Sequence, residues 1–159
     1  MHVARLVASD APRYRELMLE AYELAADAFT STAEERAREP ISWWEKRIAD
    51  ASGMSESFGA FDQTALVGTV ALEYSAKPKT QHSALVIGMY LQHKHRGSGT
   101  AQSLLQAAIA AATFRPEIQV IRLTVTEGNE SAIRLYRSAG FQAWGTEPHA
   151  IRTASGTCQ

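Results

Sequence analysis

The residues of this chain best suited to bind an anion form a short glycine-containing segment. The segment is Arg96-Gly97-Ser98-Gly99-Thr100-Ala101; it follows the apolar run that ends in Met89-Tyr90-Leu91, and it leads directly into a helical pattern. The start of a helix presents free backbone N–H groups and the positive end of the helix dipole. Because glycine has no Cβ, the backbone can approach a bound anion closely. The segment is therefore predicted to bind a phosphate or pyrophosphate group.

The spacing of this segment does not match two common phosphate-binding motifs. A nucleoside-triphosphate loop has four residues between its glycines and then Lys-Ser or Lys-Thr. The dinucleotide motif Gly-x-Gly-x-x-Gly requires a third glycine where this chain has Gln102. The pattern that is present is Arg-x-x-Gly-x-Ala, at Arg96, Gly99 and Ala101. By itself it is weak evidence, since a simple turn between a strand and a helix also uses glycines.

A second motif follows one predicted strand later in the chain. Asn129-Glu130-Ser131-Ala132-Ile133-Arg134-Leu135-Tyr136 reads Asn-x-x-Ala-x-x-Leu-Tyr, and Gly140-Phe141 comes after it. Together the two motifs resemble the GNAT family of acetyl-CoA-dependent N-acetyltransferases, whose loop reads Gln/Arg-x-x-Gly-x-Gly/Ala. The resemblance extends from Arg5 to Gly145. It implies one GNAT domain over residues 1–159, an N-acetyltransferase activity, and acetyl-CoA as co-substrate.

Composition limits the other classes of function. The chain has 159 residues, with 16 Lys and Arg against 17 Asp and Glu, and a net charge of −1. A nucleic-acid-binding protein usually has a strongly basic surface, so no nucleic-acid partner is expected. No apolar run approaches the roughly 20 residues that span a bilayer, and no signal peptide is evident. Cys158 is the single cysteine, so no internal disulfide can form and a cytoplasmic location is predicted.

The hydrophobic pattern predicts the order strand, two helices, three strands, helix, strand, helix, strand. The first helix follows the capping residues Ser9 and Asp10, and a charged segment from Glu34 to Arg38 precedes the second. Buried positions of the first helix are expected at Tyr14, Leu17, Ala21, Leu24, Ala25 and Ala28; the other helices are expected over about Ser42–Ala51, over Ala101–Ala112, and after Asn129. The predicted strands are His2–Val7, Phe58–Phe61, Leu66–Tyr74, Ala84–Leu91, Ile118–Val125 and Phe141–Trp144.

This order predicts an α+β fold with a mixed central sheet flanked by helices, as in the GNAT family. The strand–helix–strand unit through the glycine segment implies a right-handed crossover and one parallel strand pair. The family usually adds a closing strand or hairpin after the position of Trp144. Here the chain ends in the polar segment Ala154–Gln159, which has little β-propensity. We therefore expect the closing strand to be short or missing, and the open sheet edge to favour a homodimer.

The resemblance assigns most of the cofactor contacts. Residues 96–101 would bind the pyrophosphate, and the backbone of Met89, Tyr90 and Leu91 would bind the pantetheine arm, because this strand is expected to splay away from the next one. Gly88 is predicted either to form the bulge that opens this gap or to allow close backbone packing. Asn129 is expected both to cap its helix and to contact the cofactor arm. No metal site is expected.

Two residues are predicted to move protons. By resemblance the hydroxyl of Tyr136 lies beside the cofactor sulfur, where a phenol that keeps its proton at pH 7 can act as the acid; a packing residue is the alternative. Glu73 is the predicted base, since partial burial on its strand would raise its pKa. His82 is the competing base, and the third possibility is that the enzyme selects a neutral amine from solution.

The resemblance places the acceptor site near Trp43, Trp44 and Glu34, although one tryptophan in the core and a solvated Glu34 would fit the pattern equally. His149 carries no role. The predicted function is transfer of an acetyl group to a primary amine of a small molecule or protein N-terminus, by direct attack in a ternary complex. The alternative is a non-catalytic acyl-CoA-binding module of the same fold.

Overall fold

The computed structural model of this protein describes residues 1–26, 29, 31–125, 128–145, 151–153 and 156–158. Helices and strands follow the predicted order up to α5, except that three helices rather than two precede β2, because the charged segment at 34–38 lies in a short helix of its own; β2 and β4 begin earlier and β5 is shorter than expected. The helices are α1 Ala11–Leu24, α2 Ala33–Ala37, α3 Ile41–Ile48, α4 Thr100–Phe114 and α5 Glu130–Ser138. The strands are β1 His2–Arg5, β2 Ser55–Asp62, β3 Ala65–Tyr74, β4 Ser83–Leu91, β5 Val120–Arg122, β6 Ile151–Thr153 and β7 Gly156–Cys158.

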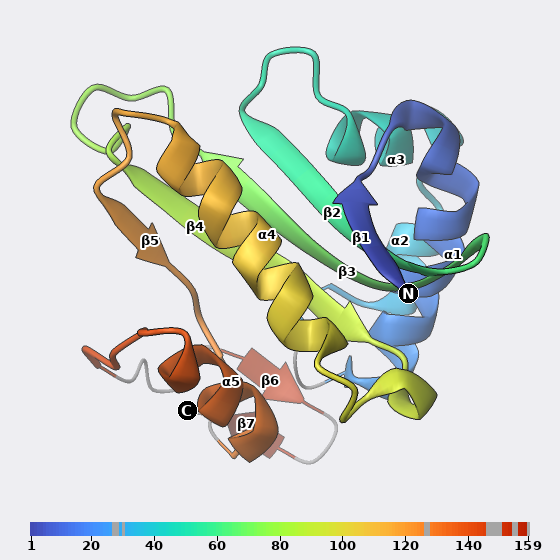
Figure 1. Cartoon of the computed structure of the whole chain (residues 1–159). Coiled ribbons are helices and arrows are strands. Elements are labelled where there is room, and N and C mark those ends of the chain that lie inside the picture. Colours follow the sequence, from blue (N-terminus) through green and yellow to red (C-terminus); the bar gives the residue numbers. More distant parts are fainter. Residues whose placement is uncertain (27–28, 30, 126–127, 146–150, 154–155, 159) are drawn as a thin grey trace.

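Five strands form one mixed sheet in the order β1-β2-β3-β4-β5. The first four pair antiparallel, and β4 pairs with β5 in parallel through the α4 crossover. Figure 1 shows α4 lying across one face of the sheet and the layer of α1, α2 and α3 on the other face. The predicted α+β architecture, a mixed sheet flanked by helices, is confirmed.

Each face of the sheet carries its own apolar cluster. The α4-side cluster is built on the buried side of α4, and its members include Phe58, Val70, Leu72, Ala84, Val86, Leu91, Leu104, Leu105, Ala108 and Ala112. The α1-side cluster includes Leu6, Tyr14, Leu17, Met18, Ala21, Tyr22, Trp44, Ile48, Leu66 and Tyr90. The expected burial of Leu24 is wrong, because its side chain is 75% exposed at the end of α1; Ala28 lies outside the described residues.

The ends of α5 follow the sequence signals. The side-chain oxygen of Asn129 accepts a hydrogen bond from the backbone N–H of Ala132 at 3.4 Å, as expected of an N-cap. Gly140 has φ +102°, the left-handed conformation that ends many helices. The predicted cap is therefore confirmed, and Gly140 ends the helix.

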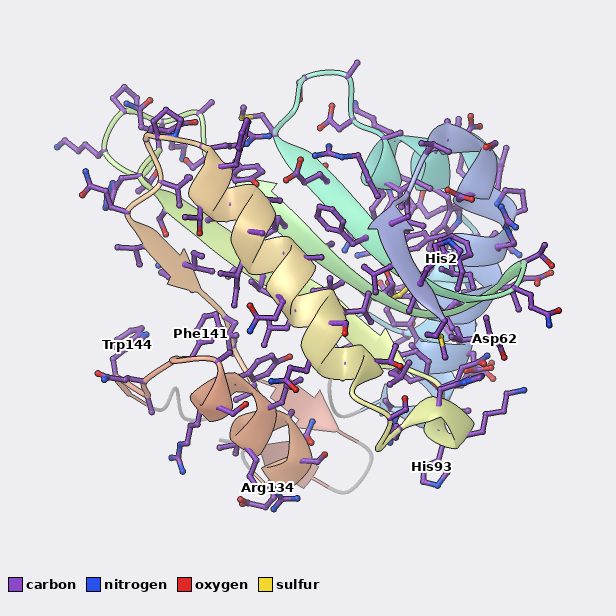
Figure 2. The ribbon with its side chains drawn as sticks, viewed as in Figure 1. His2, Asp62, His93, Arg134, Phe141 and Trp144 are labelled. Carbon is purple, nitrogen blue, oxygen red and sulfur yellow. The ribbon has the colours of Figure 1, made fainter. Side chains whose placement is uncertain are left out.

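The segment after α5 differs from the prediction. Residues 141–145 form no strand. Trp144 is 91% exposed, so its aromatic side chain has no sheet surface to pack on, and Figure 2 shows it pointing away from the body of the molecule. The polar tail does contain β structure, contrary to the prediction, because β6 and β7 pair antiparallel in a sheet of their own. Within the described residues, the five-stranded sheet receives no strand from beyond β5.

None of the described helices is both long and apolar enough to cross a membrane. The longest, α4, has 15 residues, whereas a membrane-spanning helix needs about 20 apolar residues.

Candidate active site

The glycine loop (residues 96–101) presents an uninterrupted row of free backbone donors. Among the described residues, none accepts a hydrogen bond from the N–H groups of Gly97 to Gln102, and the first bond of α4 runs from Ser103 N to Gly99 O at 3.0 Å. Gly97 and Gly99 both have φ +83°, a conformation that side chains with a Cβ rarely adopt. A Cβ built on either glycine would meet no atom within 4 Å, so the space over the loop is open. This arrangement suits a bound pyrophosphate.

Side chains hold the loop against the end of β4. The hydroxyl of Ser98 donates to His95 O at 2.7 Å and lies 2.8 Å from the hydroxyl of Thr100, which is buried. Arg96 donates from Nε to Leu91 O at 3.0 Å, so its positive charge stays beside the loop. Figure 2 shows His93 on the turn that precedes the loop.

Gly88 forms the bulge that the sequence suggested. Thr69 pairs with Tyr90 and Ala71 pairs with Ile87, so one residue of β3 faces two residues of β4 at this point. Gly88 has φ +62°, the left-handed conformation that glycine supplies in such bulges. The alternative, that Gly88 only allows close backbone packing, is not supported, because a Cβ there would come no nearer than 3.9 Å to its neighbour.

β4 and β5 separate soon after they begin to pair. The ladder joins Ser83–Leu85 to Val120–Arg122 and then stops, which leaves a gap here called the β4–β5 opening. Gln92 N donates to Val67 O on the β3 side at 2.9 Å. Since successive residues of a strand direct their backbone groups to alternate sides, Leu91 and Met89 direct theirs toward the opening. The Leu91 carbonyl that accepts from Arg96 agrees with this direction.

Tyr136 comes from α5 and packs partly buried against the α4-side cluster, as Met89 does. Its ring lies 6.0 Å from that of Phe141 in an edge-on contact. Burial raises the pKa of Tyr136 to about 12, so the phenol keeps its proton at every pH at which an acetyltransferase is assayed. No described residue is within hydrogen-bond distance of this hydroxyl, which makes the hydroxyl available to a ligand.

Glu73 points to the other face of the sheet. Val70 and Leu72 of β3 belong to the α4-side cluster, and neighbouring residues of a strand point to opposite faces, so Glu73 faces the side of α1 and α3. The partial burial expected for it is wrong, because its side chain is exposed. His82 is also exposed and lies before the first residue of β4, farther than Glu73 from the bulge.

The helical layer on the Glu73 face holds the two tryptophans. Trp44 is fully buried in the α1-side cluster, whereas Trp43 is partly buried. Glu34 is exposed and pairs with Arg38 at 3.1 Å on the surface. His149 lies outside the described residues. The sequence reasoning missed two cations beside Trp43, Arg36 and Arg47, although Trp43 and Arg47 are four residues apart on one helix, a spacing that places side chains together.

Sequence reasoning also missed a contact that fixes the end of β4. The hydroxyl of Tyr90 donates to Glu20 of α1 at 2.8 Å, and Gln92 donates to the same carboxylate at 3.2 Å. Burial and then this hydrogen bond raise the pKa of Tyr90 to about 12. The contact ties α1 to the strand that carries the predicted pantetheine contacts. In the described residues, no group of His, Cys, Asp and Glu side chains is arranged to hold a metal ion.

Residues 18–141 match the family described as the acetyltransferase (GNAT) family. The chain belongs to the GNAT acetyltransferase family. The predicted family and enzyme class, an N-acetyltransferase, are therefore confirmed.

Two curated relatives are acetyltransferases. The chain is 27% identical over 110 residues to the L-amino acid N-acetyltransferase AaaT of Escherichia coli strain K12, a match that covers 69% of this chain and 67% of that protein. It is 31% identical over 104 residues to a streptothricin acetyltransferase from Escherichia coli, covering 65% of this chain and 57% of that protein.

Solved structures share the fold at low sequence identity. A GNAT-family acetyltransferase from Streptococcus pneumoniae has a TM-score of 0.81 at 20% identity, covering 99% of this chain and 93% of that one. The yncA protein of Salmonella typhimurium, a putative acetyltransferase solved with its cofactor acetyl-CoA, has a TM-score of 0.81 at 18% identity, covering 99% of this chain and 88% of that one. Acetyl-CoA is the acetyl donor in GNAT relatives, and the free donors of the glycine loop and the open edge of β4 fit this cofactor.

Proposed function

We propose that this protein acetylates a primary amine of a small molecule or a protein N-terminus, by direct attack in a ternary complex with acetyl-CoA. One observation carries the proposal. Glu73 faces the α1 side of the sheet, and Tyr136 packs against the cluster on the α4 side. An acceptor amine can approach from the Glu73 face, while the departing sulfur is left on the Tyr136 face.

Backbone groups of the loop and of β4 would make most of the contacts with acetyl-CoA. The N–H groups of Gly97 to Gln102 would hold the pyrophosphate, and the charge of Arg96 would add to them. The backbone groups of Met89 and Leu91 would hold the pantetheine arm at the opening, with Asn129 contacting it from the start of α5. Acetyl-CoA supplies an activated acetyl thioester when it is bound in this position.

Two side chains handle the protons. Glu73 takes the proton that the amine nitrogen loses through a chain of water molecules, because its strand partner Leu85 precedes the bulge by three positions, or about 10 Å at ~3.3 Å per residue. Tyr136 gives its hydroxyl proton to the departing sulfur. The nitrogen–carbon bond forms as the carbon–sulfur bond breaks, and solvent returns the proton to Tyr136.

A release assay tests this function. Free thiol is measured with acetyl-CoA and a panel of primary amines that includes amino acids, since AaaT is named for L-amino acids. In parallel, acetyl-CoA at a hundredfold excess over its dissociation constant should raise the free energy of unfolding by about 2.7 kcal/mol. An unchanged melting temperature in saturating acetyl-CoA would contradict cofactor binding. A raised melting temperature without thiol release from any amine would favour the non-catalytic acyl-CoA-binding module.

We also propose that the protein is a homodimer. The outer edge of β5 has no partner strand in the described residues, and an unpaired edge favours pairing with another chain. Phe114 and Val120 carry exposed apolar side chains. Val120 is the first residue of β5, and Phe114 is the last residue of the helix that precedes it. Light scattering after size-exclusion chromatography should give twice the chain mass of 17.4 kDa; a monomeric mass over the whole accessible concentration range would contradict the proposal.

A further inference from the structure

One carboxylate of α1 holds the end of β4 at two points. The hydroxyl of Tyr90 donates to one oxygen of Glu20 at 2.8 Å, and the side-chain amide of Gln92 donates to the other oxygen at 3.2 Å. Residues two apart on an extended chain point to the same face, so both donors reach the carboxylate from one side of the strand. Glu20 therefore binds the last turn of the strand path before the 3-10 turn His93–His95 begins.

The partners of this carboxylate are neutral donors. Glu20 forms no ion pair with a lysine or arginine of the described residues. Arg13 lines the same surface hollow, but its guanidinium group is bound by Asp10 and by the backbone oxygen of Thr64. Hydrogen bonds in which the acceptor is ionised are stronger than those between neutral groups. Both bonds of Glu20 are of this kind, so they hold the strand end firmly.

The tyrosine that Glu20 holds lies between the two residues that face the β4–β5 opening. Tyr90 is buried in the α1-side cluster, whereas Met89 and Leu91, on either side of it, pack with the α4-side cluster. A rotation of the strand end about its own axis would pull Tyr90 away from Glu20. The contact with Glu20 therefore fixes the direction in which Met89 and Leu91 present their backbone groups.

The same tyrosine also contacts the first residue of the glycine loop. The Cζ of Arg96 lies 6.0 Å from the ring centre of Tyr90, and its Nε donates to Leu91 O at 3.0 Å. The hydroxyl and the ring of Tyr90 thus have different partners, Glu20 for the hydroxyl and Arg96 for the ring. A variant that removes only the hydroxyl leaves the surface on which Arg96 lies.

We propose that Glu20 is a positioning residue that, through Tyr90 and Gln92, holds the end of β4 in the orientation that binds the pantetheine arm of acetyl-CoA. This inference rests on the proposed function, which assigns the arm to the backbone of Met89 and Leu91. Glu20 acts through the strand and not by contact with the cofactor. Loss of its two hydrogen bonds should weaken binding of the arm and leave the pyrophosphate contacts of residues 97–102 in place.

The test compares acetyl-CoA with ADP, which has the diphosphate and the adenosine but no pantetheine arm. A hydrogen bond to a charged group is worth roughly 10- to 100-fold in an equilibrium constant. By calorimetric titration, Glu20→Ala should raise the dissociation constant of acetyl-CoA by roughly 10-fold or more, and Tyr90→Phe should raise it by a smaller factor because the bond of Gln92 remains. The dissociation constant of ADP, measured by displacement, should stay at the wild-type value in both variants.

Matched variants separate positioning from misfolding and from loss of charge. Glu16 lies one turn earlier on α1, is exposed and lines the same hollow, so Glu16→Ala should leave both dissociation constants unchanged. Glu20→Gln keeps the reach and can pair with Tyr90 and with a rotated Gln92 amide, so it should restore part of the lost affinity. Glu20→Asp keeps the charge but is too short to reach both donors, and it should restore less. If Glu20→Ala does not fold, Tyr90→Phe and Glu20→Asp provide the same comparison.

Steady-state kinetics gives a second readout that general destabilisation would not produce. In Glu20→Ala, KM for acetyl-CoA should rise while kcat and KM for the amine stay near the wild-type values. Equal losses for acetyl-CoA and ADP, or unchanged acetyl-CoA affinity in both Glu20→Ala and Tyr90→Phe, would overturn the proposal while the acetyltransferase function stands. A wild type that does not bind ADP would refute the pyrophosphate contacts and the proposal with them. If no amine is acetylated but acetyl-CoA and ADP respond differently as expected, Glu20 keeps its role and the proposed function fails.

Discussion

Glu73 on β3 pairs directly with Leu85, the last residue of β4 that pairs with β5. The carboxylate therefore stands at the point where β4 and β5 begin to separate. Because the side chain is exposed, water can join it to a bound amine. This relationship supports Glu73 as the base for a geometric reason, after the expected partial burial of its side chain was found to be wrong.

The first prediction concerns this base. Glu73→Gln keeps the size of the side chain but cannot accept the amine proton. General base catalysis typically contributes 10²–10⁴-fold, so kcat/KM for a small amine should fall by roughly this factor, and the acidic limb of its pH profile should move or disappear. The free energy of unfolding should change by no more than about 0.5 kcal/mol, as for other exposed substitutions.

His82→Ala is the matched control for Glu73→Gln. His82 is exposed and precedes β4, so its removal should change kcat/KM less than the loss of Glu73. If His82→Ala flattens the acidic limb while Glu73→Gln does not, the imidazole is the base. If neither variant changes the limb, the enzyme selects the neutral amine from solution.

The second prediction concerns the acid. Tyr136→Phe removes the hydroxyl and keeps the ring that packs on Phe141. Acetyl-CoA should bind nearly as well as to the wild type, while kcat should fall by roughly 10²–10⁴-fold. Calorimetric titration and steady-state kinetics on the same preparation measure the two quantities. Turnover at the wild-type rate would make Tyr136 a packing residue only.

The same tyrosine predicts a pH dependence of stability. Its pKa is raised from an ordinary 10.0 to about 12 in the folded protein. A raised folded pKa contributes stability that is complete below pH 10 and is lost as the pH rises through about 12. Urea unfolding between pH 9 and 12 should therefore show a larger loss of unfolding free energy for the wild type than for Tyr136→Phe. Parallel curves for the two proteins would contradict the burial of this hydroxyl.

The third prediction concerns the glycine loop. Gly99→Val introduces a Cβ into the space that faces the free N–H groups and into a backbone with φ +83°. The strain should cost about 1–2 kcal/mol of stability, and the stabilisation by acetyl-CoA should be lost. Gly53→Val is the control, because Gly53 also has positive φ, at +74°, but precedes β2 and contacts Arg115. The control should show the strain and keep the full acetyl-CoA shift; loss of the shift in both variants would assign it to general destabilisation.

The features that the sequence predicted well depend on local signals. The apolar stripe of α4 follows from the spacing of Leu104, Leu105 and Ala108. Asn129 caps α5 by accepting a hydrogen bond from the backbone N–H of Ala132, three residues further along the chain. The bulge at Gly88 could be anticipated because a left-handed residue in a strand almost requires glycine. In each case, the residue and the structure that it determines lie within a few positions of each other.

The predictions that failed depended on distant parts of the chain. Aromatic residues suggested a strand at Phe141–Trp144, but a strand needs a partner, and none of the described strands pairs with these residues. Glu73 is exposed although Ala71 and Leu72 beside it in the sequence are buried, so its neighbours in sequence do not report its exposure. The meeting of Arg36 with Arg47 on Trp43 depends on the packing of two helices, so only the Trp43–Arg47 half of it was visible in the sequence.

The last prediction tests whether the bulge at Gly88 sets the direction of the cofactor contacts. Gly88 has φ +62°, and a Cβ there would lie 3.9 Å from Ala71, an ordinary contact. Conformation, rather than space, therefore opposes a side chain. Gly88→Val should cost about 1–2 kcal/mol if the bulge is kept. If instead the bulge flattens, a one-residue shift would turn the backbone groups of Met89 and Leu91 away from the opening, and KM for acetyl-CoA should rise more than kcat falls. Gly88→Asn should retain more binding, because asparagine tolerates left-handed φ. Equal KM values for the wild type, Gly88→Asn and Gly88→Val would show that the opening forms without the bulge.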